Sequence, residues 1–320
     1  MLNHTTGQIK YHWLLCLFLN LVQIKMKFIT SKKLLIFNCL FLIFQNVSLA
    51  QKLDPKGRNS YKSDHIIKSE ITDKEYLIHM SFPKHYNIKD SITYPVLYVL
   101  DGKSTFGYFE SKYIDSEKIE DVILVGISHK VMGIQSNINR FIDYTPYRDT
   151  ITEKRIAKKF GFKYGTIKTG GANKFLECLK KEIVPFIDKN YKTNSERGIS
   201  GHSLGGLFTA YCFVNSDNYF TKFGINSPSF QLNEGIFLKP AISKFSDSQN
   251  WDINPTKVFI STGENESPMM VSNMIKFSMF LQKRNYDNVD MNWRIYRNET
   301  HSSVIPICLN GTLTTLYEKK

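Results

Sequence analysis

The segment GHSLGG at residues 201–206 constrains the fold of this chain more than any other part of the sequence. Residues 197–200 before it are predicted to form a short strand, and residues 204–214 after it a mostly apolar helix. A serine on a tight strand-to-helix turn needs small neighbours, which Gly201 and Gly205 supply. The pattern G-x-S-x-G in this setting predicts an exposed serine hydroxyl at a strand end. An ordinary serine in a glycine-rich turn is the alternative.

The rest of the chain alternates between predicted strands and predicted helices. Residues 94–100 and 121–128 are almost continuously apolar, as expected for strands buried on both faces of a parallel sheet. Residues 172–191 repeat apolar side chains at helical spacing. Four further strands and two further helices are predicted at 71–82, 222–226, 257–262 and 292–297, and at 267–284 and 303–317. This alternation predicts an α/β domain with a doubly wound, mostly parallel sheet and helices on both faces.

The first fifty residues are predicted to be a signal or targeting segment. Their apolar runs, 13–22 and 34–44, are shorter than the roughly 20 residues that span a membrane. The second run follows a basic segment that begins at Met26, and it precedes small residues that end at Ala50. We therefore expect translation to start at Met26, cleavage after Ala50, and a single domain over 51–320 that is secreted or periplasmic. A pair of membrane-associated segments is the alternative.

The charge and cysteine content favour a solvated surface with a basic bias and no nucleic-acid partner, and attraction for an anionic substrate is the alternative. The chain holds 42 basic and 29 acidic residues, but no block of five or six like charges. After removal of the leader, Cys178, Cys212 and Cys308 would remain, and this odd, scattered set predicts no disulfide framework. Cys178 and Cys212 lie in apolar helical patterns and are expected to be buried thiols. Because no histidine pair has metal-binding spacing, we expect no metal and no cofactor.

A serine hydroxyl is a poor nucleophile without a base, and that base needs an acid to orient it. In the α/β-hydrolase fold the chain order is serine, acid, histidine. His301 is the only histidine after Ser203, and it follows the last predicted strand. Glu266 and Glu264 both follow the preceding strand. Glu266 is favoured because it stands three residues past the turn glycine and can return toward His301. A helix cap for Glu266 and an exposed loop position for His301 are the alternatives.

Backbone N–H groups are candidates for an oxyanion hole. Leu204 begins the helix after the serine, and Gly102 or Lys103 follows the early strand 94–100. A simple turn is the other interpretation of Gly102. Residues 143–169 are polar and rich in lysine and threonine, so we expect a loop or cap near the active site.

Several segments together resemble one known family. YPVLYVLDG at 94–102, the helix at 170–191, RGISGHSLGGLFTAY at 197–211, and the GENE and ETH segments are similar to the esterase D-like "putative esterase" family. The resemblance extends from about residue 67 onward. RFIDYTP at 140–146 resembles the R-x-x-D-Y-T-P signature of its siderophore-esterase branch, which hydrolyses catecholate trilactones such as enterobactin and bacillibactin.

The resemblance implies an α/β-hydrolase fold with Ser203, Glu266 and His301 as the catalytic triad. It also implies that Arg140 lies near the substrate, where a guanidinium could bind an anionic or carbonyl group. A structural ion pair with Asp143 is the alternative for Arg140.

One departure from the branch concerns the aromatic residues after Ser227-Pro228-Ser229. Relatives often carry paired tryptophans there, whereas this chain has Phe230-Gln231. The sequence thus predicts a secreted serine esterase that hydrolyses small-molecule or carbohydrate-linked esters through an acyl-enzyme, with a siderophore trilactone as one substrate. It predicts no stable membrane anchor after processing. A feruloyl or acetyl-xylan esterase, an acyltransferase on the same triad, and a non-enzymatic binding protein are the alternatives.

Overall fold

The computed structural model describes residues 63–109, 116–235, 237–239, 241, 243 and 254–319. Within these ranges, no helix combines the length and the apolar content needed to cross a membrane. The predicted leader and its processing after Ala50 lie outside the described residues.

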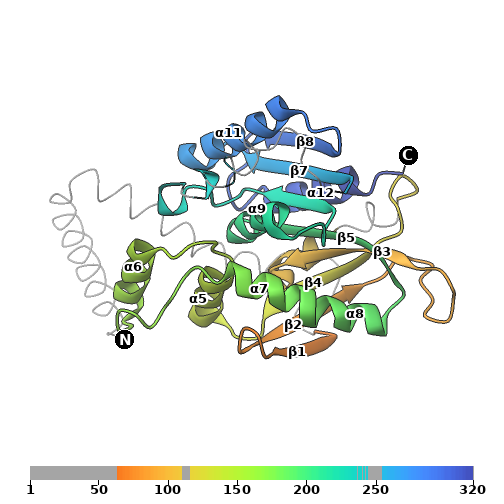
Figure 1. Cartoon of the computed structure of the whole chain (residues 1–320), viewed down its shortest axis with the longest axis horizontal. Coiled ribbons are helices and arrows are strands. Elements are labelled where there is room, and N and C mark those ends of the chain that lie inside the picture. Colours follow the sequence, from red (N-terminus) through yellow and green to blue (C-terminus); the bar gives the residue numbers. More distant parts are fainter. Residues whose placement is uncertain are drawn as a thin grey trace, which may run out of the picture. The chain divides into compact units, whose positions relative to one another are not determined.

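Eight strands form one sheet in the order β1-β2-β4-β3-β5-β6-β7-β8 (Figure 1). The strands are β1 (His65–Ser69), β2 (Lys74–Ser81), β3 (Tyr94–Leu100), β4 (Ile123–His129), β5 (Thr193–His202), β6 (Lys222–Asn226), β7 (Thr256–Gly263) and β8 (Val289–Tyr296). β1 and β2 pair antiparallel, as do β2 and β4, and every later pairing is parallel. The expected mostly parallel sheet is confirmed.

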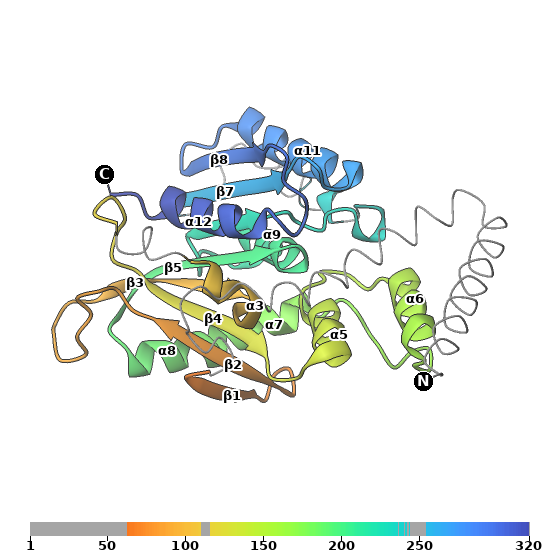
Figure 2. The same cartoon turned by 180° about the vertical axis from the view of Figure 1, so that it is seen from behind.

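Helices cover both faces of this sheet. Their bounds are α3 (Gly102–Thr105), α5 (Gly133–Asp143), α6 (Thr150–Phe160), α7 (Ala172–Cys178), α8 (Val184–Asn190), α9 (Leu204–Asn215), α11 (Pro268–Arg284) and α12 (Ile305–Leu316). The helical segments η2 (Phe106–Tyr108), η3 (Leu179–Ile183) and η4 (Leu232–Gly235) are shorter. Helices α7, α8, α9 and α11 contribute to one core cluster, and α12 packs with η2 in a second cluster. Figure 2 shows α12 and α3 in front of the sheet, on the side away from α7 and α8.

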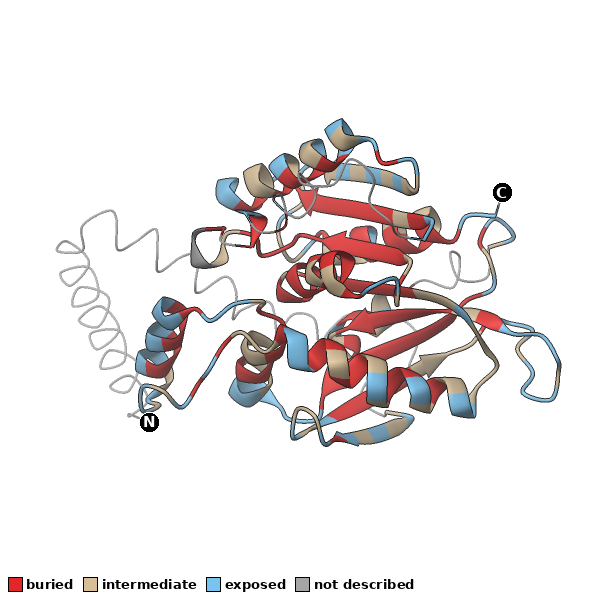
Figure 3. Ribbon diagram, in the orientation of Figure 1, coloured by how far each residue is buried: buried red, intermediate tan, exposed pale blue. Residues whose placement is uncertain are grey.

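The central strands are buried on both sides, which explains their apolar runs. In β3, Val96 and Tyr98 belong to the first cluster, while Leu97 and Val99 belong to the second. Figure 3 shows the central strands as buried, with exposed residues on the outer turns of the helices. Such strands bring the residues that follow them to one edge of the sheet, where α/β proteins place their sites.

Several elements were not foreseen. Among them, the edge strand β1 and the helix α5 lie in segments for which no element was predicted. The segment 143–169, expected to be a loop or cap, contains the helix α6 in its middle. The Asp149 side chain caps this helix by accepting from the Thr152 N–H at 2.9 Å, and Gly161 ends it in the left-handed region.

The cysteine predictions are confirmed for the described residues. Cys178, Cys212 and Cys308 are all buried and none forms a disulfide. Burial raises the pKa of each thiol, so none of the three is a reactive nucleophile.

Candidate active site

The turn after β5 holds Ser203 in a backbone conformation that few non-glycine residues adopt, with φ 61° and ψ −118°. The turn is tight because β5 and α9 approach closely. A Cβ atom added to Gly201 would lie 2.4 Å from the carbonyl carbon of Gly205, and one added to Gly206 would lie 2.4 Å from the carbonyl oxygen of Asn226. The glycines are therefore a steric requirement of the turn that raises the serine side chain.

The structure brings Ser203, His301 and Glu266 into one line of contacts. Ser203 Oγ lies 2.9 Å from Nε2 of His301, and Nδ1 of His301 lies 2.7 Å from Oε2 of Glu266. The three side chains follow β5, β8 and β7, whose carboxyl ends share one edge of the sheet. The imidazole thus bridges the hydroxyl and the carboxylate, which is the geometry of a nucleophile, a base and an orienting acid.

Glu266 is buried, and its carboxylate is fully engaged. Its Oε1 accepts hydrogen bonds from the Ser227 hydroxyl at 2.5 Å and from the Gly263 N–H at 2.8 Å. Burial alone would raise the pKa of Glu266, but the hydrogen bond and charge of His301, helped by those two donors, hold that pKa below its usual value. Glu264 lies outside this arrangement, since its Oε2 accepts from the Asn298 N–H at 2.9 Å. The geometry thus places only Glu266 of the two candidates against the imidazole.

The backbone N–H groups of Gly102 and Leu204, the expected oxyanion donors, differ from that of Lys103 in their hydrogen bonding. The Lys103 N–H donates to the Ser128 hydroxyl at 2.6 Å and is not available to a ligand. By contrast, within the described residues no protein group accepts from the N–H of Gly102 or Leu204. Gly102 packs against Gly126 of β4 so closely that an added Cβ would lie 2.6 Å from the Gly126 Cα. Between the two alternatives after β3, the structure favours Gly102.

Arg140 does not pair with Asp143. Its Nε and Nη2 donate to Oδ1 and Oδ2 of Asp101, both at 2.8 Å, in a bidentate ion pair. The alternative of an Arg140–Asp143 ion pair is therefore wrong, because Asp101 from the turn after β3 takes the guanidinium. Burial alone would lower the pKa of Arg140, but the Asp101 carboxylate raises it above its usual value.

His202, beside the serine, is a residue that sequence reasoning did not single out. It is buried, and its ring lies 4.5 Å from that of His301 between centroids. Burial, with smaller contributions from the charges of His301 and Arg140, lowers the pKa of His202 well below its usual value. His202 is therefore neutral at neutral pH and places no fixed positive charge against the neighbouring imidazole.

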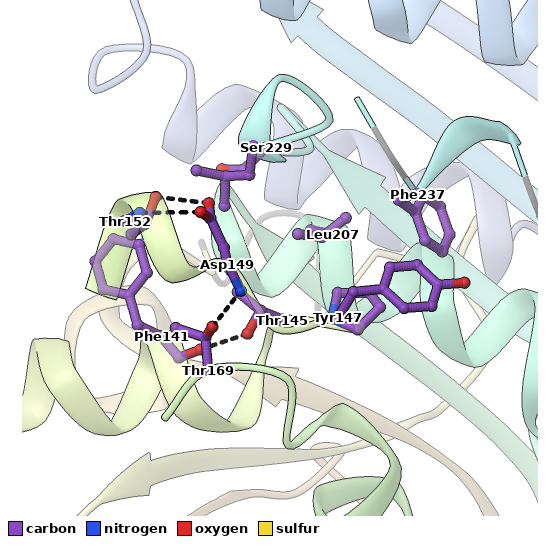
Figure 4. A pocket seen from close by; sticks show the side chains of 11 residues that line it. Phe141, Thr145, Tyr147, Asp149, Thr152, Thr169, Leu207, Ser229 and Phe237 are labelled. Carbon is purple, nitrogen blue, oxygen red and sulfur yellow. Dashed lines mark hydrogen bonds between the residues drawn. The ribbon is translucent and has the colours of Figure 1, made fainter. Parts of the chain in front are cut away.

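A small pocket opens next to the serine (Figure 4). Ser229 connects the two, because its Oγ lies 3.3 Å from that of Ser203 and its side chain lines the pocket. The remaining lining residues are Phe141, Thr145, Pro146, Tyr147, Asp149, Thr152, Thr169, Leu207, Leu232 and Phe237. Figure 4 shows Asp149 joined to Thr152 and Thr169 by hydrogen bonds. These polar groups are thus partnered by one another.

The lining shows what the segment 143–169 contributes. It supplies six pocket residues, from the end of α5 through α6 to the following loop. The sequence offered only length and irregular composition as signals for this segment. Ser227 and Ser229 were noted only as part of a Ser-Pro-Ser segment, and their contacts with Glu266 and Ser203 were not foreseen.

Comparisons with known proteins identify the family of this chain. A family model described as "Putative esterase" matches residues 69–271. The ferri-bacillibactin esterase BesA of Bacillus subtilis (strain 168) is 26% identical over 230 residues, which cover 69% of this chain and 78% of that protein. The apo-salmochelin esterase of Escherichia coli O6:H1 is 31% identical over 144 residues, or 42% of each chain.

Solved structures extend the likeness to the fold. The BES protein from Bacillus cereus aligns with a TM-score of 0.66 and 28% identity, over 80% of this chain and 94% of that one. An IroE-like serine hydrolase from Shewanella oneidensis aligns with a TM-score of 0.66 and 25% identity, over 79% of each chain. Together with the sheet order, these likenesses confirm the expected α/β-hydrolase fold.

Proposed function

Because the chain belongs to the putative esterase family, and so to the carboxylic ester hydrolases, we propose that it cleaves its substrate through an acyl-enzyme on Ser203. One observation carries this proposal: the chain of contacts of 2.9 Å and 2.7 Å that joins Ser203, His301 and Glu266. The arrangement gives the hydroxyl a base and gives the base an orienting carboxylate.

In the proposed reaction, Ser203 Oγ attacks the ester carbonyl carbon while its proton passes to Nε2 of His301. The N–H groups of Gly102 and Leu204 then donate to the negative oxygen of the tetrahedral intermediate. His301 returns the proton to the leaving alcohol, and the acyl group stays on Ser203. Water, deprotonated by the same imidazole, releases the acid. Glu266 holds Nδ1–H and stabilises the imidazolium.

As substrates we propose catecholate trilactone siderophores. The support is the similarity to the ferri-bacillibactin and apo-salmochelin esterases, together with the RFIDYTP segment at 140–146. Phe230, which stands where relatives often carry tryptophan, is fully buried and stacks on Phe237 with centroids 5.6 Å apart. It is therefore a core residue and does not contact substrate. Tyr147 is the most exposed aromatic side chain that lines the pocket, and we propose that it meets a catechol ring.

A feruloyl or acetyl-xylan ester is the second candidate substrate. An endo-1,4-beta-xylanase/feruloyl esterase of Xylanibacter ruminicola is 26% identical over 118 residues, which cover 36% of this chain and 14% of that protein. Transfer of the acyl group to an alcohol would use the same intermediate.

We also propose that the protein is secreted and processed after Ala50, as the layout of residues 26–50 suggests. N-terminal sequencing of exported protein tests this proposal, since an intact N-terminus would contradict it.

The function is tested by hydrolysis of an ester panel with the wild type, Ser203→Ala and Ser278→Ala. The panel holds p-nitrophenyl acetate, methyl ferulate, acetylated xylan, and ferric and iron-free enterobactin. Ser278 is a buried serine of α11 whose hydroxyl donates to the sulfur of Met274 at 3.3 Å, so its variant controls for loss of a buried hydroxyl.

We expect Ser203→Ala to lose roughly 10³-fold or more of kcat and Ser278→Ala to retain activity. Fastest turnover of the trilactones supports the siderophore assignment, and turnover of only methyl ferulate or xylan replaces it. Full activity of Ser203→Ala would refute the nucleophile.

A further inference from the structure

The turn after β3 is built so that one backbone N–H, that of Gly102, is left for a ligand. We propose that Arg140 and Asp101 form a positioning pair that fixes this N–H in the oxyanion hole. The proposal rests on the proposed ester hydrolysis, and it differs from a role for Arg140 in contacting substrate.

The ion pair itself has the geometry of a rigid clamp. Two parallel hydrogen bonds of 2.8 Å join the Arg140 guanidinium to both oxygens of Asp101, and the two side chains are 23% and 13% exposed. Bidentate pairs of this kind fix orientation as well as distance. On its other side, Oδ2 of Asp101 lies 3.5 Å from the position a Cβ of Gly205 would take, against the helix that begins after Ser203.

The backbone of Asp101 needs such a clamp. Its φ of 57° places it in the left-handed region, which costs a non-glycine residue on the order of 1 kcal/mol. The carbonyl oxygen of Asp101 accepts from the N–H groups of Ser104 at 2.8 Å and Thr105 at 3.1 Å. The N–H of Lys103 donates to the Ser128 hydroxyl. These bonds close the turn around Gly102, and the orientation of Asp101 sets the direction of the Gly102 N–H.

The helix that carries Arg140 is itself fastened to the sheet. Asp143, one turn later on α5, accepts from Lys74 Nζ at 2.6 Å and from the Tyr76 hydroxyl at 2.9 Å, and it lies 2.8 Å from Nε2 of His129. These partners belong to β2 and β4. In the RFIDYTP segment, the aspartate therefore anchors the helix and the arginine, three residues earlier, reaches the catalytic turn.

Tyr144 completes the cluster. It is buried, and its ring lies 5.9 Å from the Arg140 guanidinium carbon. Arg140 thus contacts the turn after β3 through its charge and packs against the ring of Tyr144 on its own helix end. A change at Arg140 would be felt at Gly102 whichever ester is bound.

Positioning and substrate binding give different kinetics. If Arg140 positions Gly102, its loss lowers kcat for every ester, because the oxyanion forms in each reaction. If Arg140 binds an anionic group of the substrate, its loss raises KM for anionic esters and leaves neutral esters unchanged. The neutral ester p-nitrophenyl acetate therefore separates the two roles.

The experiment compares the wild type, Arg140→Lys, Asp101→Asn, the double variant, and Arg197→Lys as the matched control. Arg197 is 20% exposed and pairs with Asp188 at 2.9 Å, and it stands six residues before Ser203 along β5, away from its carboxyl end. Each protein is assayed on p-nitrophenyl acetate and on enterobactin, for the inhibition constant of phenylboronic acid, and for the rate at which a fluorophosphonate labels Ser203. Thermal unfolding of each variant monitors its fold.

We expect kcat on both esters and the labelling rate to fall roughly 10- to 100-fold in both single variants, with KM changed by less than about twofold. Phenylboronic acid, which forms a tetrahedral adduct on serine, should lose affinity by the same factor. The double variant should be no worse than either single one, because the pair acts as a unit. Arg197→Lys should keep wild-type kinetics.

Unchanged kcat on p-nitrophenyl acetate in Arg140→Lys would overturn the positioning role, and a raised KM confined to enterobactin would assign Arg140 to substrate binding. If Ser203 of the wild type is labelled but no ester of the panel is cleaved, the proposed substrates are refuted. The labelling rates of the variants then test the positioning pair of Arg140 and Asp101. Absence of labelling at Ser203 would overturn both proposals.

Discussion

Replacing Glu266 by glutamine removes the charge of the proposed acid while preserving its size. Its Oε1 accepts from the Gly263 N–H at 2.8 Å, and that backbone group can only donate. The glutamine carbonyl must therefore stay toward Gly263, which turns the amide NH₂ toward Nδ1 of His301. Turning it the other way would leave a buried N–H without an acceptor, at a cost of about 1–3 kcal/mol.

The magnitude follows from this forced orientation. An NH₂ group facing Nδ1 favours the tautomer with the proton on Nε2, which cannot accept the proton of Ser203. The carboxylate that would stabilise the imidazolium is also lost. We expect kcat to fall roughly 10³- to 10⁴-fold, equivalent to about 4–5.5 kcal/mol of transition-state stabilisation.

The assay is the steady-state hydrolysis of p-nitrophenyl acetate by Glu266→Gln, with Glu264→Gln as the matched control. Glu264 stands two residues earlier, is exposed, and accepts from the Asn298 N–H. Its variant should retain activity and lose at most about 1 kcal/mol of stability. A Glu266→Gln enzyme within tenfold of the wild type, or a Glu264→Gln enzyme with the large loss, would refute the assignment of the acid.

Three further predictions concern the turn and its surroundings. Ser203→Gly should be about 1 kcal/mol more stable to urea than Ser203→Ala, because glycine relieves the positive φ; equal stabilities would show that the turn is unstrained. Gly206→Ala should lower the free energy of unfolding by several kcal/mol, since its Cβ would lie 2.4 Å from a backbone oxygen, and a change within about 0.5 kcal/mol would contradict the close approach. Folding lowers the pKa of His202, so below its usual pKa of 6.5 this side chain binds a proton only in the unfolded protein. The free energy of unfolding should therefore decrease as the pH is lowered below that value, by up to about 1.4 kcal/mol per pH unit. Urea titrations at pH 7 and 5.5 should show a smaller fall for His202→Gln, and identical slopes would refute this account.

Much of the sheet could be predicted because its central strands are buried on both faces. The ranges 94–100 and 222–226 agree with β3 and β6 to the residue, and the apolar run of β3 ends abruptly at Asp101. The position of Ser203 between a strand and a helix followed from the same pattern.

The helices and strands that the sequence did not predict are stabilised by tertiary contacts. β1 alternates weakly and pairs only with β2 at the edge of the sheet. Helix α6 lies in a stretch rich in lysine and threonine, and only Ile156 and Ala157 provide an apolar stripe. Its N-terminal cap by Asp149 was a local signal that could have revealed it.

The ion-pair partner of Arg140 could not be predicted from the sequence, for a different reason. Asp143 is three residues away, at a spacing that suits an ion pair within a helix. Asp101, 39 residues earlier, takes the guanidinium because the sheet brings the end of β3 beside α5, while β2 and β4 occupy Asp143. The choice between two carboxylates depended on strand order, which charge patterning does not reveal.

The line from Ser203 to His301 also sets when the chain can react during its synthesis. The two residues are 98 positions apart, so a ribosome at roughly 5–20 residues per second makes the serine about 5–20 seconds before its base. Until the end of β8 and α12 have been made and folded onto the sheet, the nascent chain carries a serine with no proton acceptor. By the proposed mechanism, ester cleavage therefore begins only after β8 and α12 are in place.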